Sequence, residues 1–583
     1  MKYRWSMAPC DASMARSLAR EVGCSLALSR CLLNRGFLDA NGAAAFLEPR
    51  LRQLGDPDLL PDMAVAVERL IQARDRGERV VLFGDYDVDG VTATALLEEI
   101  MSALGWQVSS YLPSRFEEGY GLSLMAAGNC ADGLQPRLLL AIDCGSTAVE
   151  SIAWLNQAGI DVIVLDHHQL GSVLPAPVAL VNPRRTDTSE GPGVELCSAG
   201  LAFKLAHALV KEGRRMGWAE AAGCDLRWVL DLAALGTVAD LVPLRGENRI
   251  LVAVGLEYLE RTRRPGLQAL KRVAGTRNPP GVYEVAFQLA PRLNAAGRLE
   301  SASDALELLL TRDAGKAEAL ARRLDERNRE RQRLERGIAD EATMVVRTWF
   351  DPARDFVIVE GKAEWHVGVV GIVASRVLRE FGRPAIILGG DGDEWRGSGR
   401  SIVGFDLASA LGECREHLVR HGGHGMAAGL SLRPDQLEPF RRRLNAIAHA
   451  RLQPADFEPI LQLDLELCLA EVNLGLVEEL GRLDPIGQGN PAVQVAVRGL
   501  NLVGGSRRMG GEAQHARFRV SDGTATAEAV WWNCGNRPIP TGRFDLAVTP
   551  QVNTYQGRTS VQLKVLDWQP ADSSGSGTAA GVG

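Results

Sequence analysis

Acidic side chains alternate along the segment GDYDVDG, which directly follows the apolar run RVVLF at 79–83. Asp85, Asp87 and Asp89 stand two residues apart, as in the first half of an EF-hand calcium loop. Position twelve of such a loop would be Leu96 rather than glutamate, and a β-type run stands where the entering helix should be. We therefore interpret the segment as an acidic turn between a strand and a helix, at the edge where parallel sheets bind ligands.

Two further apolar runs end in residues that can also bind a metal ion. RLLLAID ends in Asp143, and IDVIVLD ends in Asp166 and is followed by His167 and His168. Because the carboxyl ends of parallel strands meet at one edge, we expect these side chains to face one crevice. A further carboxylate, Asp240, stands where a helical pattern ends in LGTVADLVPL. Each residue alone is typical of a turn or a helix cap, but their joint occurrence indicates a metal site.

The donor types favour particular metals and a particular reaction. Carboxylates with one or two imidazoles suit Mn²⁺ or Mg²⁺ better than a structural zinc ion. Crowded carboxylates repel one another unless cations neutralise them, so one ion is implied and a second is compatible with the set. Two ions about 3.5–4 Å apart would suit phosphoester hydrolysis. The chain has no GxxxxGK[ST], GxSxG or HExxH motif that would favour other catalytic chemistry.

The surrounding pattern predicts the elements that carry these residues. Apolar strand-like runs alternate with helical patterns from Glu78 onward, which indicates an α/β fold with a parallel sheet covered by helices. Residues 303–347 predict one long helix, either laced with i,i+4 ion pairs or carrying a basic face along a groove. The alternation restarts at Asp355. After residue 455, short β-like runs predict a small OB-type barrel or a sandwich.

Composition limits the class of protein. With 583 residues, 46% hydrophobic and 23% charged, the chain should form about three to five globular domains. No apolar run approaches the roughly 18 residues of a membrane helix, and we expect a cytoplasmic protein. The ten cysteines are scattered without a CxxC pair, which argues against a zinc ribbon or a disulfide framework. A net charge of −7 means that any polyanion site must be local.

The strings GDYDVDG, LLLAIDCGS, VIVLDHH and LGTVADLVPL together resemble the DHH phosphoesterase superfamily. PRLNAAGR, WHVGVVGIVASR, GSGRS, GGHGMAAG and DPIGQGNP follow in the order of the RecJ single-strand-specific exonucleases, over roughly residues 75–570. This resemblance implies a metal-dependent 5′→3′ exonuclease that degrades single-stranded DNA to nucleoside 5′-monophosphates with Mn²⁺ or Mg²⁺, in DNA repair and recombination.

The resemblance also implies an architecture. The fold would combine a DHH parallel-sheet domain, a long connecting helix, a second α/β (DHH-associated) domain and a C-terminal OB-type β-barrel. The expected divisions are an N-terminal packing extension (1–74), the DHH catalytic domain (75–300), the connecting helix (301–348), the DHH-associated domain (349–452), the OB-fold nucleic-acid-binding domain (455–570) and a flexible tail (571–583).

Carried over to this sequence, the family's site residues form two groups. The metal ligands would be Asp85, Asp87, Asp89, Asp143, His167 and Asp240, with Asp85 and Asp87 favoured among the first three, and with His168 near the scissile phosphate. The substrate-binding residues would be Arg115, Arg292, Asn294, Arg298, Ser398, Arg400 and His424. In GSGRS, small residues let backbone N–H groups approach an anion while the arginine forks onto it, and a hairpin turn is the alternative.

Other functions are considered beside this one. A DHH phosphodiesterase acting on short oligonucleotides, cyclic dinucleotides or pyrophosphate would need neither a connecting helix nor a β-rich module. A non-catalytic single-strand-binding scaffold would have lost the acidic set, which is intact. Single-stranded DNA is the expected partner, with a single-strand-binding protein and a helicase as further ones. For Trp531, Trp532, Tyr555 and Trp568, core burial is expected over base stacking.

Overall fold

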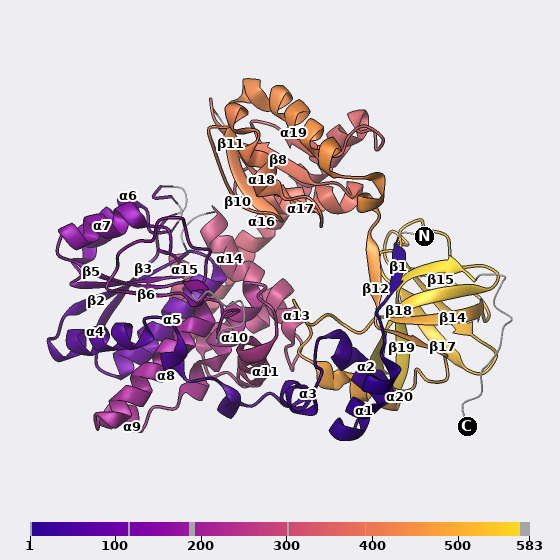
Figure 1. Cartoon of the computed structure of the whole chain (residues 1–583), viewed down its shortest axis with the longest axis horizontal. Helices are drawn as coiled ribbons and strands as arrows, with labels where there is room; N and C mark the ends of the chain where they lie inside the picture. The colour runs from indigo at the N-terminus through magenta and orange to yellow at the C-terminus, as the bar shows by residue number, and fades with distance from the viewer. Residues whose placement is uncertain are drawn as a thin grey trace. The chain divides into compact units, whose positions relative to one another are not determined.

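The computed structural model describes residues 3–114, 117–119, 121–185, 193–299, 302–390 and 392–571, with only the backbone at 298 and 299. The chain forms two compact units, whose elements are labelled in Figure 1. The larger unit comprises Pro49–Phe457 and Gly487–Gly489. The smaller unit joins the N-terminal stretch that ends at Glu48 to Glu458–Ile486 and to the chain from Asn490 onward. The expected extension 1–74 is therefore divided between the two units.

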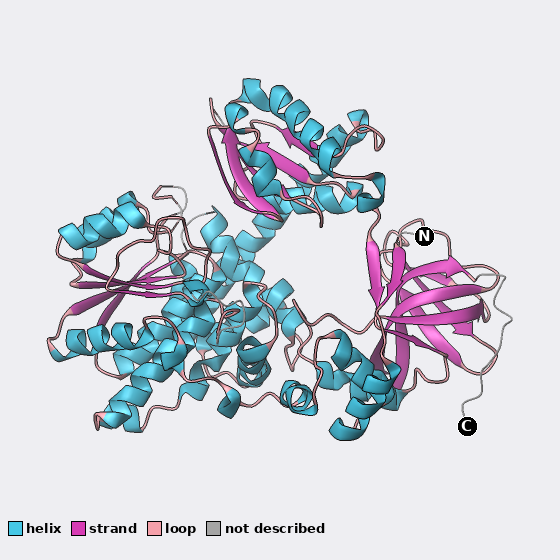
Figure 2. Cartoon of the chain, viewed as in Figure 1, coloured by secondary structure: helices cyan, strands magenta, loops and turns pink. Residues whose placement is uncertain are grey.

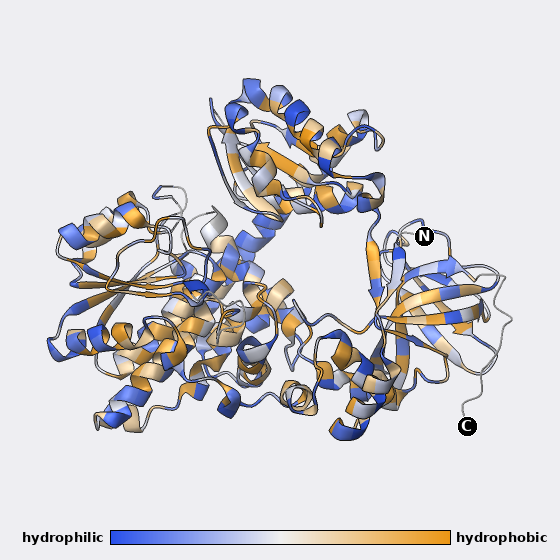
Figure 3. Cartoon of the chain, viewed as in Figure 1, coloured by the Kyte–Doolittle hydropathy of each residue, from blue (hydrophilic) through white to orange (hydrophobic). Residues whose placement is uncertain are grey.

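A parallel sheet with the strand order β3-β2-β4-β5-β6 organises the first half of the larger unit. Strands β2, β4 and β5 are short runs rich in Val, Leu and Ile that are buried on both faces, and they are largely orange, the colour of hydrophobic residues, in Figure 3. The bounds of the strands in this sheet are β2 (Arg79–Gly84), β3 (Gln107–Tyr111), β4 (Leu138–Ile142), β5 (Asp161–Leu165) and β6 (Ala179–Val181).

Alternate residues of these strands enter two different cores. Val81, Phe83 and Leu139 pack against helices α6 (Leu124–Leu134) and α7 (Val149–Gln157). Val80, Leu82 and Leu140 pack into a larger core with helices on the other face. Those helices are α4 (Met63–Asp75), α5 (Val88–Ala103), α8 (Ser198–Arg215), α10 (Leu230–Ala239), α11 (Gly246–Glu260), α12 (Pro265–Ala274) and α14 (Ala290–Leu299).

The expected single helix over 303–347 is in fact two helices. Helix α15 (Ser303–Leu310) ends at Thr311, whose backbone is extended, and α16 (Ala314–Trp349) starts afresh at Asp313, whose side chain accepts a hydrogen bond from the Lys316 N–H. A strong N-cap at Asp313 therefore breaks the pattern before Gly315. Along α16, the i,i+4 ion pairs Arg322–Glu318, Arg329–Asp325 and Arg331–Glu335 agree with the first of the two interpretations.

The second half of the larger unit is another α/β fold, with the sheet order β10-β11-β9-β8-β7. Strands β7 and β8 are parallel, and the remaining pairs are antiparallel. Helix α17 packs with the end of α16 on one face. The bounds are β7 (Ile358–Gly361), α17 (Val370–Phe381), β8 (Ala385–Gly389), β9 (Trp395–Arg400), α18 (Leu407–Gly412), β10 (Arg420–His424), β11 (Ala427–Leu432) and α19 (Leu437–Arg451).

The smaller unit is built on a β-rich sheet in the order β13-β14-β18-β19-β17-β16-β15, and β14 also pairs with β16, which gives a barrel-like closure (Figure 2). Its strands are β13 (Leu465–Leu467), β14 (Val495–Leu502), β15 (Arg507–Met509), β16 (His515–Ser521), β17 (Thr526–Trp531), β18 (Phe544–Tyr555) and β19 (Arg558–Pro570). Trp531 is buried in the barrel core, whereas Trp532 is 47% exposed and Tyr555 is 68% exposed. The expectation of core burial is therefore wrong for Trp532 and Tyr555, because the sheet directs their rings outward.

The N-terminal helices belong to the core of this smaller unit. Leu28, Leu32 and Phe46, from α2 (Leu26–Asn34) and α3 (Ala40–Leu47), share one hydrophobic cluster with Val495 and Phe544 of the barrel. A short strand, β1 (Arg4–Met7), pairs in parallel with β12 (Ile460–Leu463). None of the described helices in either unit is long and apolar enough to cross a membrane.

Candidate active site

Three neighbouring strands place their terminal aspartates along one edge of the parallel sheet. The strand ladder continues one residue past each strand: the N–H of Asp85 donates to the Ile142 carbonyl, that of Asp143 to Leu165 and that of Asp166 to Val181. Asp143 adopts a left-handed φ of 63°, which turns the chain sharply at the end of β4. The strand-end prediction for Asp85, Asp143 and Asp166 is thus confirmed as geometry.

The turn after β2 brings a second carboxylate to this edge. Asp87 caps α5, because its Oδ1 accepts hydrogen bonds from the N–H groups of Asp89 (2.9 Å) and Gly90 (3.1 Å). A Cβ at Gly90 would lie 2.7 Å from the carbonyl oxygen of Asp85, so this close approach of helix to strand requires glycine. The final glycine of GDYDVDG therefore lets the first turn of α5 pack closely against Asp85 at the end of β2.

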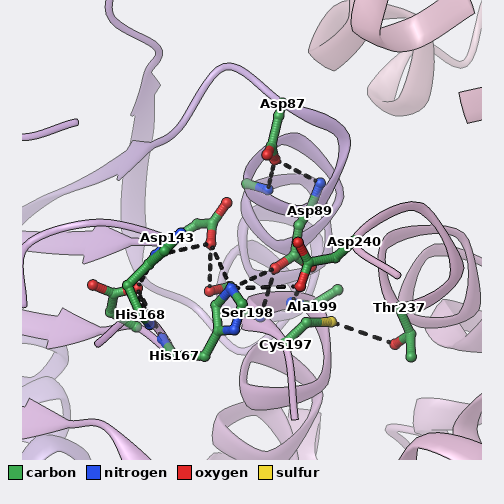
Figure 4. A network of polar contacts seen from close by, with 12 residues as sticks. Asp87, Asp89, Asp143, His167, His168, Cys197, Ser198, Ala199, Thr237 and Asp240 are labelled. Atoms are coloured by element: carbon green, nitrogen blue, oxygen red, sulfur yellow. Dashed lines mark hydrogen bonds and ion pairs between the residues drawn. The ribbon is translucent and has the colours of Figure 1, made fainter. Parts of the chain in front are cut away.

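Helix α8 binds the third aspartate of this segment through its first backbone groups. The N–H groups of Ser198 and Ala199 donate to the two oxygens of Asp89, at 2.7 and 2.8 Å. The Ser198 hydroxyl donates to Asp143 Oδ1 at 2.9 Å (Figure 4). Ser198 therefore connects two of the predicted ligands and was not identified from the sequence. Its only signal is its position at the start of a helical pattern, which many serines share.

His167 points into the middle of the carboxylates. Its Nε2 lies 3.4 Å from Asp143 Oδ1, 3.6 Å from Asp240 Oδ2 and 3.7 Å from Asp89 Oδ2 (Figure 4). Asp240 reaches this point from the C-terminal end of α10, as the sequence pattern predicted. The backbone carbonyl of His167 accepts a hydrogen bond from Arg184 Nε at 2.6 Å.

His168 is held beside the metal-ligand candidates by Asp166. Its Nδ1 lies 2.7 Å from Asp166 Oδ1, which also accepts from the backbone N–H groups of both histidines. The other oxygen of Asp166 accepts from the Ser146 N–H. The His168 side chain is 40% exposed and that of His167 only 10%, so His168 is the histidine that a substrate can reach.

Burial and mutual repulsion disturb the protonation of these groups. Burial, and after it the neighbouring Asp87, raises the pKa of Asp89 to about 6. Burial with Asp89 and Asp87 raises the pKa of Asp240 to about 9. The pKa of Asp143 also lies well above its ordinary value, because it is buried among Asp87, Asp89 and Asp85. Without a cation, the site therefore holds protons in place of negative charge.

The pKa values of the two histidines are shifted in opposite directions. Burial, together with the charge of His168, lowers the pKa of His167 to about 4, so its imidazole is neutral and suited to ligation. Burial opposes the charge of His168 as well, but its hydrogen bond and ion pair with Asp166 outweigh burial and raise its pKa to about 9. His168 is therefore a proton donor at neutral pH, whereas His167 is a potential metal ligand.

The donor set fits a divalent cation. Asp143 Oδ2 and His167 Nε2 are buried, and neither has a hydrogen-bond partner among the described residues. Ligand atoms lie within 4.8 Å of one another in three groups: Asp85, Asp87 and Asp143; Asp143, His167 and His168; Asp89, Cys197 and Asp240. Asp143 belongs to two of these groups. Cys197 was not identified from the sequence; apart from it, the set consists of the hard oxygen and imidazole donors that Mn²⁺ and Mg²⁺ accept.

The residues of PRLNAAGR lie within helix α14 rather than in a turn at a helix start. Asn294 Oδ1 accepts a hydrogen bond from the Val88 N–H at 3.1 Å, which supports the first turn of α5. Arg292 donates to Asp325 of α16 at 2.9 Å, so its charge is paired within the fold. The side chain of Arg298 and the whole of Arg115 lie outside the described residues.

The remaining predicted substrate contacts lie in the sheet of the second α/β fold. Arg400 of β9 pairs with Ala427 of β11, which pairs with His424 of β10, so Arg400 and His424 share one face of the sheet. Arg400 donates to the Ser398 hydroxyl and the Gly399 carbonyl, both at 2.8 Å. No acidic partner of Arg400 occurs among the described residues, and its burial lowers its pKa.

Comparisons with known proteins identify the family. Residues 79–237 match the model of the DHH family, N-terminal domain, residues 354–450 the DHHA1 domain, and residues 463–567 the RecJ OB domain. The single-stranded-DNA-specific exonuclease RecJ of Bacillus subtilis is 37% identical over 99% of this chain and 73% of its own length.

Comparison with solved structures leads to the same family. The crystal structure of RecJ from Thermus thermophilus in complex with Mn²⁺ has a TM-score of 0.83 at 30% identity, covering 98% of this chain and 80% of that one. The same protein in complex with Mg²⁺ gives a TM-score of 0.77 at 29% identity, covering 98% of this chain and 79% of that one. The chain belongs to the RecJ family of single-stranded-DNA-specific exonucleases. The expected combination of DHH, DHH-associated and OB-type domains is thereby confirmed.

Proposed function

We propose that this protein is a metal-dependent 5′→3′ exonuclease that degrades single-stranded DNA to nucleoside 5′-monophosphates. The observation that carries the proposal is the meeting of Asp143 and His167 among the other carboxylates, each with a buried atom that no described residue hydrogen-bonds. Buried polar atoms without a partner cost free energy, and a bound divalent cation would offset that cost. The metal complexes of the Thermus relative support Mn²⁺ or Mg²⁺ as the cofactor.

The residues have distinct roles in this proposal. The metal ligands are Asp85, Asp87, Asp89, Asp143, His167 and Asp240, of which Asp143 is shared by two groups. When bound, Mn²⁺ or Mg²⁺ polarises the phosphoryl oxygens and makes water a stronger acid. Asp166 orients His168 and keeps it protonated, so His168 offers a proton toward the scissile phosphate. Ser198 fixes the carboxylate of Asp143 through its hydroxyl group.

The direction of cleavage is assigned to the Arg400 pocket. Ser398, Arg400 and His424 would bind the 5′-phosphate, since Arg400 is a partly buried cation whose hydrogen bonds go to neutral acceptors. Gly371 of α17 approaches the same place, because a Cβ there would lie 3.0 Å from Ser398 Oγ and 3.1 Å from Arg400 Nη2. Arg115, Arg292, Asn294 and Arg298 are the proposed contacts from the catalytic domain. The ion pair of Arg292 with Asp325 would in addition fix α14 on α16.

Each part of the chain has its own role in this proposal. We place catalysis in 75–300, the connector in 301–348, the DHH-associated fold in 349–452 and nucleic-acid binding in the OB-type fold of 455–570. In the cell, a helicase that supplies single strands and a single-strand-binding protein that covers them are the proposed partners. The cytoplasm is the proposed location, and repair and recombination are the proposed setting.

One assay tests the function directly. Single-stranded and duplex DNA, labelled at the 5′ or the 3′ end, would be incubated with the protein and Mn²⁺, Mg²⁺ or a chelator. We expect a 5′ label to be released at once as a mononucleotide and a 3′-labelled strand to shorten progressively. Duplex DNA should remain intact, and so should single strands in the presence of the chelator. Cleavage inside the strand, or degradation from the 3′ end, would contradict the proposal.

A further inference from the structure

Arg184 stands at the catalytic edge of the parallel sheet, just beyond strand β6. That strand ends at Val181, whose carbonyl accepts the N–H of Asp166, and the chain then makes a short 3₁₀ turn over Pro183–Arg185. Arg184 is exposed, and its Nε donates to the His167 carbonyl at 2.6 Å. Its guanidinium group therefore lies beside the histidine that points into the carboxylates.

The fully buried side chain of Asn182 fixes this arginine relative to the two histidines. Its Oδ1 accepts a hydrogen bond from the backbone N–H of Arg184 at 2.8 Å. Its Nδ2 donates to the His168 carbonyl at 2.9 Å and to the Ser146 hydroxyl at 2.8 Å. One amide thus connects the backbone of Arg184 to the segment that carries both histidines.

The charge of Arg184 reaches the acidic pocket from the end of β6. Burial is the main cause of the low pKa of His167, and the positive charges of His168 and Arg184 add to it. The raised pKa of Asp240 results chiefly from burial, and the charge of Arg184 opposes that rise. His167 follows β5 whereas Asp240 stands at the end of α10, so the guanidinium lies within electrostatic range of two sides of the site.

Most of the donors of this guanidinium are not used by the fold. An arginine side chain offers five N–H groups, and among the described residues only the His167 carbonyl accepts one from Arg184. No described carboxylate forms an ion pair with it. The next residue differs, because Arg185 pairs with Asp62 and donates to the Leu180 carbonyl at 2.8 Å. Arg184 is therefore a cation beside the metal-ligand candidates that has donors left for an anion.

A phosphate group is the anion that this arrangement fits. A guanidinium presents its N–H groups in a planar fork that matches two phosphate oxygens. Negative charge on the nonbridging oxygens grows as a phosphodiester is hydrolysed, so a fixed cation beside them binds the transition state more tightly than the ground state. Removal of one such donor from an enzyme lowers kcat by about 10²–10³-fold.

We propose that Arg184 is a catalytic residue that binds a nonbridging oxygen of the scissile phosphate and stabilises the charge that develops there. The inference rests on the proposed function, because it adds a residue to the same reaction. A water oxygen bonds to phosphorus and releases a proton to solvent, while the bond from phosphorus to the 3′ oxygen breaks and that oxygen takes a proton from His168. Arg184 exchanges no proton, and Asn182 is a positioning residue for it.

The first test compares Arg184→Gln, Arg184→Lys and the wild type in full-length protein, with single-stranded DNA at saturating Mn²⁺. Arg184→Gln should lower kcat and kcat/KM together by about a hundredfold, as expected when an interaction of the transition state is lost. Arg184→Lys should retain more activity, since it keeps the charge but not the fork. Arg185→Gln, one residue further in the same turn, is the matched control and should keep wild-type kinetics.

Mn²⁺ binding separates contact with the substrate from support of the fold. If Arg184 served only to hold the His167 backbone, its loss would weaken Mn²⁺ binding, and saturating Mn²⁺ would restore kcat. If Arg184 acts on the phosphate, loss of a nearby positive charge should leave the Mn²⁺ affinity equal or make it tighter, while kcat stays low. Calorimetric titration of the DNA-free proteins measures the affinity. Weaker Mn²⁺ binding with restored kcat would overturn the proposal.

Chemical rescue tests the charge itself. Arg184→Ala leaves space for a small molecule, so guanidinium chloride, at concentrations that leave the circular dichroism spectrum unchanged, should raise its turnover by about tenfold or more. Urea has a similar shape without the charge and should not, and sodium chloride at equal ionic strength is the salt control. Rescue no greater with guanidinium than with urea would overturn the role of the charge. Failure of the wild type to degrade the strand with Mn²⁺ would instead overturn the proposed function.

Discussion

His168 Nδ1 lies 2.7 Å from Asp166 Oδ1, and Asp166 also binds the backbone N–H groups of both histidines. One carboxylate therefore fixes the orientation of the histidine and its charge. Since the contact raises the pKa of His168 to about 9, the imidazolium persists through neutral pH. The negative partner of this histidine is itself kept ionised, because the pKa of Asp166 is lowered by its hydrogen bonds with His168 and Ser146 in spite of its burial.

The first prediction concerns this pair. Asp166→Asn should lower the pKa of His168 toward its ordinary value of about 6.5, so the protonated fraction is lost between pH 6.5 and 9. We expect turnover at saturating Mn²⁺ to fall at least about tenfold at pH 8 and to recover in part toward pH 6. Asp161→Asn, on the same strand and paired with Arg69, is the control. A rate lowered equally at all pH values would show that Asp166 acts only through the fold.

Asp143 should be the carboxylate whose loss is most damaging, because it belongs to two of the three ligand groups. Asp143→Asn keeps the size of the side chain but removes its charge, and we expect turnover to fall by more than about a thousandfold with an unchanged circular dichroism spectrum. Calorimetric titration should also show fewer bound Mn²⁺ ions than in the wild type. If the variant is well folded and keeps wild-type turnover, Asp143 is not required for catalysis.

Mn²⁺ affinity should rise with pH between about 6 and 9. In the metal-free site the raised pKa values of Asp89 (about 6) and Asp240 (about 9) mean that these groups hold protons which the ion must displace. A raised carboxyl pKa in the folded state also means that metal-free stability falls as pH rises through this window, so Mn²⁺ should raise the melting temperature more at pH 8.5 than at pH 6.

Titrations in buffers of different ionisation enthalpy would measure the released protons. Asp240→Asn should flatten the upper part of the pH dependence, since it removes the carboxyl group whose pKa is raised to about 9. A Mn²⁺ affinity that stays constant from pH 6 to 9 would contradict the assignment of these carboxylates as ligands.

The sequence could predict the strand-end carboxylates because their positions follow from short-range periodicity. Asp85, Asp143 and Asp166 each end an apolar run, and parallel strands bring such ends together whatever the rest of the chain does. Ser198 could not be found in this way. Its contact with Asp143 joins residues 55 positions apart, and it depends on where α8 packs against the sheet.

Two other features depended on tertiary packing. The apolar faces of α2 and α3 reveal that these helices are buried but not against which partner, and the partner proves to be the barrel. Trp531 and Trp532 are equally hydrophobic in the sequence, and only the sheet decides which of them faces out. The break between α15 and α16 was the exception, since Asp313 is a local capping signal that the long helical pattern concealed.

Arg400→Ala should reduce discrimination between 5′-phosphorylated and 5′-hydroxyl strands by about tenfold or more, which corresponds to the roughly 1.5–3 kcal/mol of a charge-assisted contact. Ser398→Ala should have a smaller effect, since its hydroxyl group is neutral. The measurement is the ratio of kcat/KM for the two strand ends. Arg442→Ala, an exposed arginine on α19, is the control. An equal reduction on both ends would assign Arg400 to the fold rather than to the phosphate.

The last prediction concerns the N-terminal helices. Leu32 is fully buried in the core shared with the barrel, whereas Leu38 is 67% exposed. Leu32→Ala should therefore lower the free energy of unfolding of the smaller unit by about 2–5 kcal/mol, and Leu38→Ala by less than about 0.5 kcal/mol.

Limited proteolysis with increasing urea would locate the effect, because fragments from 458–571 should form at lower urea concentration in the Leu32→Ala protein. Metal-dependent cleavage of the terminal phosphodiester should persist, since the carboxylates lie in the other unit. If 458–571 resists proteolysis equally in both variants, the N-terminal helices are dispensable for the barrel, and their burial against it contributes little to its stability.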